Sequence, residues 1–132
     1  RPHRPIADVI EWDTHEWSQI ERPGRSAKTL QRVATGRARF GARFVAPYYS
    51  GGSGLTGRSI HRPIGTITTR DRWAHLDGDR MRMLRLSEVH AAVGFRADYV
   101  LPEGHKDALS MLGNAVCRPV PADMLVAIRE AA

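Results

Sequence analysis

Cysteine and lysine are both scarce in this chain of 132 residues. Cys117 is the only cysteine, so a single chain has neither an internal disulfide nor a thiolate metal cluster. No segment approaches the roughly 18 consecutive apolar residues that span a bilayer, and the N-terminus lacks the apolar run of a signal peptide. We therefore expect a soluble protein of the cytoplasm with no membrane contact.

Two common kinds of site are also missing. The six histidines include no pair at helical i, i+4 spacing and no partner thiol, so the sequence predicts no metal site. A glycine-rich segment, residues 50–57, is followed by Arg58 and Ser59, whereas a phosphate-binding loop needs lysine and then serine or threonine there. This segment is either a flexible linker or a loop that follows DNA.

The composition predicts a folded but loop-rich module. Hydrophobic residues make up 42% of the chain, enough for a core, while 12 glycines and 8 prolines indicate many loops. The first residue is Arg1 rather than methionine, which suggests a processed product or a fragment.

Positive charge is concentrated in the middle of the chain. Residues 22–85 include 14 basic and 3 acidic side chains, whereas the two flanks together include 6 basic and 11 acidic ones. A basic block of this kind is typical of a nucleic-acid-binding face, because neutralising phosphates releases counterions. The alternative is a solvated basic surface. The preference for arginine over lysine fits selection for bidentate contacts or, equally, a GC-rich genome.

The first half of the chain predicts one helix and several strands. Ser26 is a candidate cap for a helix over residues 27–35, with Gly36 at its end. Strands are predicted over 45–49 and 64–69, and residues 73–76 are predicted to pair back across Asp77 and Gly78 as a hairpin. A short apolar element is expected at residues 6–10. Trp12 and Trp17 are interpreted as packing anchors, because the acidic residues beside them in sequence repel phosphate.

The second half predicts three helices. Residues 87–93 and 107–112 have helical patterns that end at Gly94 and Gly113, and a terminal helix is expected to begin at Pro121. The apolar face of the terminal helix would consist of Met124, Leu125 and Ile128.

Two segments resemble conserved motifs of one family. Gly113-Asn114-Ala115-Val116, followed by Pro119 and Val120, is similar to the tenth motif of the DNA cytosine-5 methyltransferases. Arg82-Met83-Leu84 with Glu88, Gly94 and Phe95 resembles the ninth, although Arg85, Ser87 and Arg96 depart from its pattern. The run Thr66-Ile67-Thr68-Thr69 resembles the threonine-rich signature of the family's target-recognition domains.

The resemblance implies an α+β fold that corresponds to the last third of such an enzyme. Residues 1–85 would form a small mixed target-recognition domain of short strands and loops. Residues 86–132 would form helices that complete a Rossmann-like methyltransferase domain.

The resemblance also implies two ligands. S-adenosylmethionine would contact Gly113, Asn114, Ala115 and Val116, once the missing catalytic portion is present. Double-stranded DNA would contact Thr66, Thr68, Thr69, Arg70, Arg72 and Arg82. An arginine binds either guanine, which gives sequence discrimination, or phosphate, which only positions the duplex.

No catalytic residue is predicted in this chain. The family's nucleophile is a cysteine in a Pro-Cys pair, whereas Cys117 follows Val116 and is interpreted as a small buried residue. The Phe-x-Gly-x-Gly and Glu-Asn-Val segments of the family are also missing. The chain is therefore expected to be inactive alone and to need a catalytic N-terminal half as its partner.

Two hypotheses remain. The chain is either a split or truncated part of a methyltransferase, as in a bacterial or phage restriction-modification system, or a non-catalytic DNA-binding or regulatory remnant of one. Burial of the terminal helix distinguishes them, because a free-standing module should cover its own apolar face.

Overall fold

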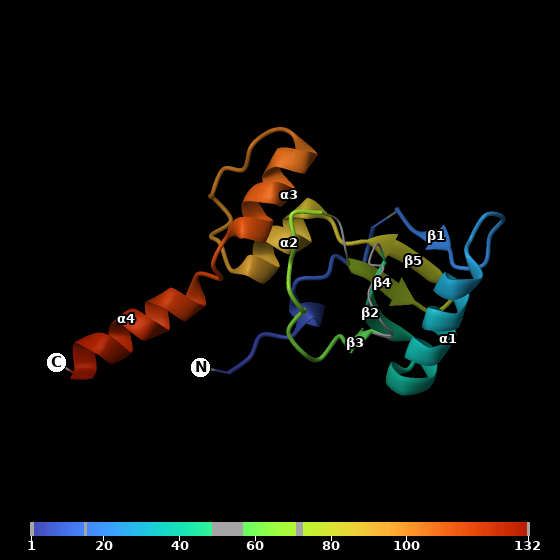
Figure 1. Ribbon diagram of the computed structural model, residues 1–132, viewed down its shortest axis with the longest axis horizontal. Coiled ribbons are helices and arrows are strands. Elements are labelled where there is room, and N and C mark those ends of the chain that lie inside the picture. The colour runs from blue at the N-terminus through green and yellow to red at the C-terminus, as the bar shows by residue number, and fades with distance from the viewer. Residues whose placement is uncertain (1, 15, 49–56, 71–72, 132) are drawn as a thin grey trace. The chain divides into compact units, whose positions relative to one another are not determined.

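The computed structural model describes residues 2–14, 16–48, 57–70 and 73–131, and these form two compact units (Figure 1). The first unit consists of Arg1–Thr66 and Asp71–Leu84, and the second of Ile67–Arg70 and Arg85–Ala132. The short segment 67–70 thus groups with the C-terminal helices, although the sequence placed it in the target-recognition region.

The first unit is built around an antiparallel sheet, which makes the protein a mixed α+β fold. Its five strands lie in the order β1-β5-β4-β2-β3. In sequence order they are β1 (Ser18–Gln19), β2 (Arg43–Pro47), β3 (Arg58–Ser59), β4 (Trp73–Asp77) and β5 (Arg80–Met83). A short 3-10 turn, η1 (Ile6–Asp8), corresponds to the apolar element expected near the N-terminus.

Helix α1 (Ala27–Phe40) begins as predicted but ends later. The hydroxyl oxygen of Ser26 accepts a hydrogen bond from the Thr29 N–H at 3.2 Å, as an N-cap does. The prediction that Gly36 ends the helix was wrong. Gly36 is buried inside the helix, and the chain turns instead at Gly41, whose φ of 82° suits glycine.

One face of the sheet packs against α1 (Figure 1). Residues that pair across neighbouring strands share a face, and the pairs Phe44 with Leu76 and Leu76 with Met81 place three apolar side chains there. The buried cluster comprises Ile20, Val33, Phe44, Ala46, Ala74, Leu76 and Met81. Side chains alternate between the two faces along each strand, so the residues adjacent to these, among them Arg43, His75 and Arg82, lie on the opposite face.

The hairpin prediction is confirmed, and one strand prediction is wrong. Strands β4 and β5 pair with Asp77 opposite Arg80, and Gly78 in the turn has a φ of 58°. Residues 64–69 form no strand. The Trp73 indole N–H donates to the Thr66 carbonyl at 3.1 Å, so this backbone bonds a side chain rather than a neighbouring strand.

Near the middle of the chain, β2 runs from Arg43 to Pro47 instead of over the predicted residues 45–49. Tyr49 and most of the glycine-rich segment lie outside the described residues.

The second unit contains α2 (Leu86–Val93), α3 (His105–Asn114) and α4 (Pro119–Ala131). Gly94 ends α2 in the left-handed conformation, as predicted. The Arg85 N–H donates to the Glu88 carboxylate at 2.7 Å, although an arginine side chain offers no acceptor to complete the capping box. Helix α3 continues through Gly113 to Asn114, so the predicted end at Gly113 was one residue early.

Candidate nucleic-acid and cofactor surfaces

Gly113 lies directly against the backbone of the threonine-rich segment. A β-carbon at Gly113 would be 2.4 Å from the Thr68 carbonyl carbon and 2.5 Å from the Thr69 nitrogen. Atoms do not approach so closely, so only glycine allows α3 and residues 68–69 to pack in this way. Two segments singled out separately in the sequence, 45 positions apart, therefore meet in one unit.

The segments that resemble the ninth and tenth motifs also touch each other. A β-carbon at Gly94 would lie 3.0 Å from the Cδ atom of Pro119. The Arg118 N–H donates to the Val93 carbonyl at 3.3 Å. The end of α2 and the start of α4 are thus packed and hydrogen-bonded together.

Two of the four expected cofactor residues, Asn114 and Val116, are exposed. Asn114 is the last residue of α3, and its carboxamide faces solvent. Ala115 caps the helix through its N–H, which donates to the Leu112 carbonyl at 3.2 Å, and Val116 is 67% exposed. The carboxamide offers both a donor and an acceptor to a polar ligand, so Asn114 fits the role that the resemblance implies, while Gly113 is occupied by packing.

The expected DNA residues do not form one group. Thr66 and Thr69 are exposed, and Arg70 is exposed at the end of the segment. Thr68 is half-buried, and its hydroxyl donates to the Arg70 carbonyl at 3.0 Å, which fixes the turn that presents Arg70. Arg72 lies outside the described residues.

Arg82 requires a correction, because it is buried and structural. Its residue is 4% exposed, and its guanidinium donates to the Met83 carbonyl at 3.1 Å and to the Glu11 carbonyl at 2.8 Å. It also lies over the Trp17 ring, 5.0 Å from the centroid. A guanidinium in this position fastens the N-terminal segment to the sheet and does not face a DNA duplex.

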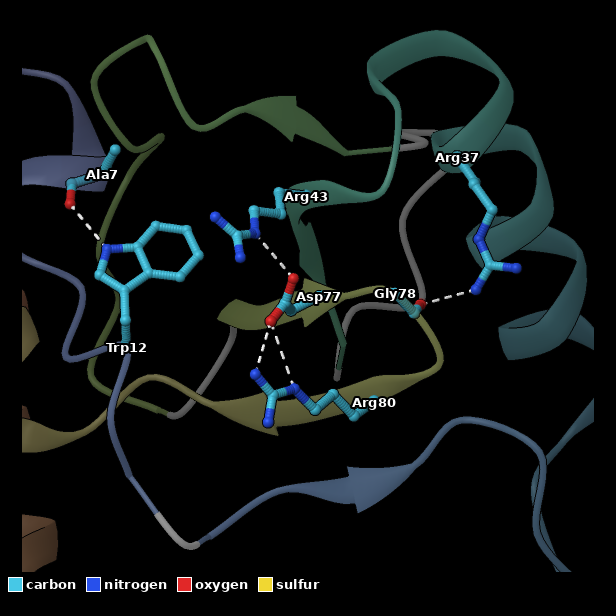
Figure 2. A network of polar contacts seen from close by, with 7 residues as sticks. All are labelled: Ala7, Trp12, Arg37, Arg43, Asp77, Gly78 and Arg80. Carbon is cyan, nitrogen blue, oxygen red and sulfur yellow. Dashed lines mark hydrogen bonds and ion pairs between the residues drawn. The ribbon is translucent and has the colours of Figure 1, made fainter.

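Sequence reasoning missed a network on the sheet face opposite α1 (Figure 2). The Asp77 carboxylate accepts hydrogen bonds from Arg43 at 2.8 Å and from Arg80 at 2.7 Å. Arg43 stacks over Trp12 and Arg80 over Trp17, with 4.6 and 4.4 Å from guanidinium carbon to ring centroid. The two arginines thus pair with a carboxylate and with indole rings. The position of Asp77 and Arg80 on either side of the hairpin turn was a usable signal.

The two tryptophans are packing anchors, as predicted. Both meet the fully buried ring of His75 edge-on, at 4.8 Å for Trp12 and 5.0 Å for Trp17. The acidic residues beside them in sequence do not account for this role, because arginines from the sheet lie over both indole rings.

The network also sets the ionisation of Asp77. Partial burial would raise the pKa of this carboxyl, but the hydrogen bonds and positive charges of Arg80 and Arg43 outweigh it and hold the pKa below its ordinary value. The carboxylate is therefore ionised at neutral pH and keeps both arginines in place.

The C-terminal segment departs from expectation at Cys117, which is exposed rather than buried. Helix α4, which follows it, also buries none of its residues. The predicted apolar face of α4 is uncovered: Met124 is 60% exposed, Leu125 68% and Ile128 64%.

Comparisons with known proteins give no relative: no family model, curated protein or solved structure matches this chain. Within the described ranges, no helix combines the length and the apolar character needed to cross a membrane. The same residues include no group of three or more histidine, cysteine, aspartate or glutamate side chains placed to bind a metal ion.

Proposed function

We propose that this chain is the C-terminal part of a DNA cytosine-5 methyltransferase, either a split subunit or a fragment. It would provide DNA recognition and one wall of the S-adenosylmethionine pocket. A separate N-terminal portion would supply the catalytic cysteine and the rest of a Rossmann-like domain.

The observation that favours this proposal most is the close packing of Gly113 on Thr68 and Thr69. The sequence resemblance selected these two segments for different reasons. Their contact is expected if both belong to one site where the cofactor and the target base approach each other.

The exposed side chains fit the same proposal. S-adenosylmethionine would supply the methyl group, and the Asn114 carboxamide would bind one of its polar groups. The solvent-facing Met124, Leu125 and Ile128 give α4 an apolar face that lacks a covering surface within the second unit. A catalytic N-terminal domain would cover that face.

The alternative is a DNA-binding remnant without catalytic function, and the departures from the ninth motif favour it. Arg96 stands where the family has proline and pairs with Asp98 at 2.9 Å, and Arg85 leaves α2 without a side-chain cap.

Transfer of labelled methyl groups from S-adenosylmethionine to duplex DNA distinguishes these functions. The chain would be assayed alone and together with the product of the reading frame immediately upstream of its gene, which is also assayed by itself. Activity only in the mixture supports the split enzyme. Inactivity of every sample, with DNA binding retained, supports the remnant. Methyl transfer by the chain alone would contradict the inference that this chain lacks the catalytic nucleophile.

In the active mixture, Cys117→Ser serves as a control. This variant should keep full activity, because the proposed nucleophile belongs to the other portion.

A further inference from the structure

One long stretch of the chain, most of it in the first unit, has no carboxylate side chain. Residues 22–70 contain ten lysine and arginine side chains and no aspartate or glutamate. Helix α1 lies within this stretch, so every charged side chain of the helix is positive. An ordinary solvent-facing helix mixes both signs of charge, which stabilises it through i, i+4 pairs.

Many of the nearby arginines already have internal partners. Arg25 donates to the Tyr48 hydroxyl at 2.7 Å and to the Gln19 carbonyl at 3.0 Å. Arg37 donates to the Gly78 carbonyl at 2.7 Å (Figure 2). It also pairs with Asp79. Such arginines stabilise the unit and are not available to a ligand without loss of those bonds.

Lys28 and Arg39 are different. Both are exposed, and neither forms an ion pair with any carboxylate in the described part of the chain. Arg39 lies over the Phe40 ring at 5.3 Å, which orients its side chain without neutralising its charge. Lys28 and Arg39 are therefore solvent-exposed positive charges on α1.

The two cations belong to a stripe along one side of the helix. Residues at spacings of three, four and four positions share a helical face, and the exposed side of α1 has this spacing. The stripe, which we call the α1 stripe, consists of Lys28, Gln31, Arg32, Thr35 and Arg39. Arg32 donates to the Pro47 carbonyl at 2.9 Å, so it is partly engaged in the fold.

The position of Lys28 has a cost that packing does not explain. It lies in the first turn of α1, where the helix macrodipole disfavours positive charge, and that turn contains no acidic residue. A cation that opposes the dipole at an exposed position is better explained by an anionic ligand than by stability.

The dimensions and composition of the stripe suit duplex DNA. Arg39 is eleven positions after Lys28, which is about 16 Å along the helix axis. A helix of about 10–12 Å diameter enters a major groove about 12 Å wide. The apolar side chains of α1 are packed on the sheet, and the exposed side also presents the small residues Ala34 and Ala38. A membrane surface would instead require exposed large apolar residues.

We propose that the α1 stripe binds the phosphates of duplex DNA, with Lys28 and Arg39 as its two phosphate contacts. This proposal rests on the DNA-binding part of the proposed function and on nothing in its catalytic part. It adds a surface to the exposed segment at Arg70, to which the sequence resemblance pointed.

The test is the salt dependence of binding by this chain alone to a 20-base-pair duplex. Log K falls with log salt concentration by about 0.9 for each phosphate contact. The double variant Lys28→Gln with Arg39→Gln should therefore have a slope shallower by about 1.8 than the unchanged chain. Circular dichroism would establish that α1 remains folded.

A matched control removes two positive charges elsewhere, with Arg96→Gln and Arg129→Gln in the second unit, both of which are exposed. Its slope should equal that of the unchanged chain. Equal reductions in both double variants, or no reduction in either, would overturn the proposal. So would an unchanged chain that binds polyglutamate and not DNA, which would identify an acidic protein as the ligand.

The outcomes are separable from those of the methyl-transfer assay. An active mixture with an unaltered salt slope in the Lys28 and Arg39 variant refutes the α1 stripe alone. A shallower slope without methyl transfer in any mixture keeps the stripe and refutes the enzyme.

Discussion

Gly113 and Thr68 are packed so closely that a β-carbon on the glycine would lie 2.4 Å from the threonine carbonyl carbon. We therefore predict that Gly113→Ala forces α3 away from residues 68–69 and lowers the free energy of unfolding by about 1–3 kcal/mol, as overpacking does. Urea denaturation would measure the change.

The matched control for this prediction is Gly104→Ala at the N-terminal end of the same helix. Its new β-carbon would meet only the Asp107 side chain, whose nearest atom, Oδ2, lies at an ordinary contact distance of 3.4 Å. Equal stability losses in the two variants would mean that the close approach at Gly113 has no special cost.

Asp77 gives a second prediction, because one carboxylate positions two arginines. Asp77→Asn removes the charge that Arg43 and Arg80 share and should lower the free energy of unfolding by about 1–2 kcal/mol, since both arginines are about half exposed and partly solvated. The control is Asp79→Asn. Its carboxylate is 89% exposed, and the change should stay within about 0.5 kcal/mol.

A pH dependence follows from the same residue. The pKa of Asp77 is lowered in the folded protein, so its contribution to stability is present above the ordinary aspartate pKa of about 3.9 and is lost as pH falls through the folded value. The stability difference between the unchanged chain and Asp77→Asn should therefore be constant from pH 7 to pH 5 and shrink below pH 4. A difference that grows on acidification would show that the pKa is raised.

The success of sequence reasoning differed between local and long-range features. The Ser26 cap, the turn at Gly78 and the left-handed Gly94 were predictable, because each depends on the chemistry of a few adjacent residues. The β-branched run at 64–69 failed as a strand, because the competing partner of its backbone, the Trp73 indole, is decided by tertiary packing. The prediction that Arg82 contacts DNA failed for a similar reason, since only the path of the N-terminal segment places the Glu11 carbonyl beside this side chain.

The division of roles between the two expected ligands gives a fourth prediction. Arg70→Ala should weaken binding to duplex DNA, whereas Asn114→Ala should weaken binding of S-adenosylmethionine by the reconstituted enzyme. Both side chains are exposed, so neither change should alter folding. Fluorescence anisotropy with DNA and equilibrium dialysis with the cofactor would separate the two effects. If each variant weakened both ligands equally, the assignment of separate roles would be wrong.

The uncovered face of α4 gives the last prediction. Leu125 is 68% exposed, so Leu125→Glu should leave the stability of the isolated chain within about 0.5 kcal/mol. In the proposed enzyme the same side chain would be buried against the catalytic portion, where an unpaired carboxylate is costly. Association of the two parts, measured by calorimetry, should therefore weaken at least tenfold.

Val126→Glu is the matched control, because it adds the same charge at an exposed position two residues from both Met124 and Ile128, on the other side of α4, and should leave association unchanged. Equal weakening by both variants would attribute the effect to charge rather than to the apolar face. Undiminished association of Leu125→Glu would exclude this face from the interface and favour the DNA-binding remnant.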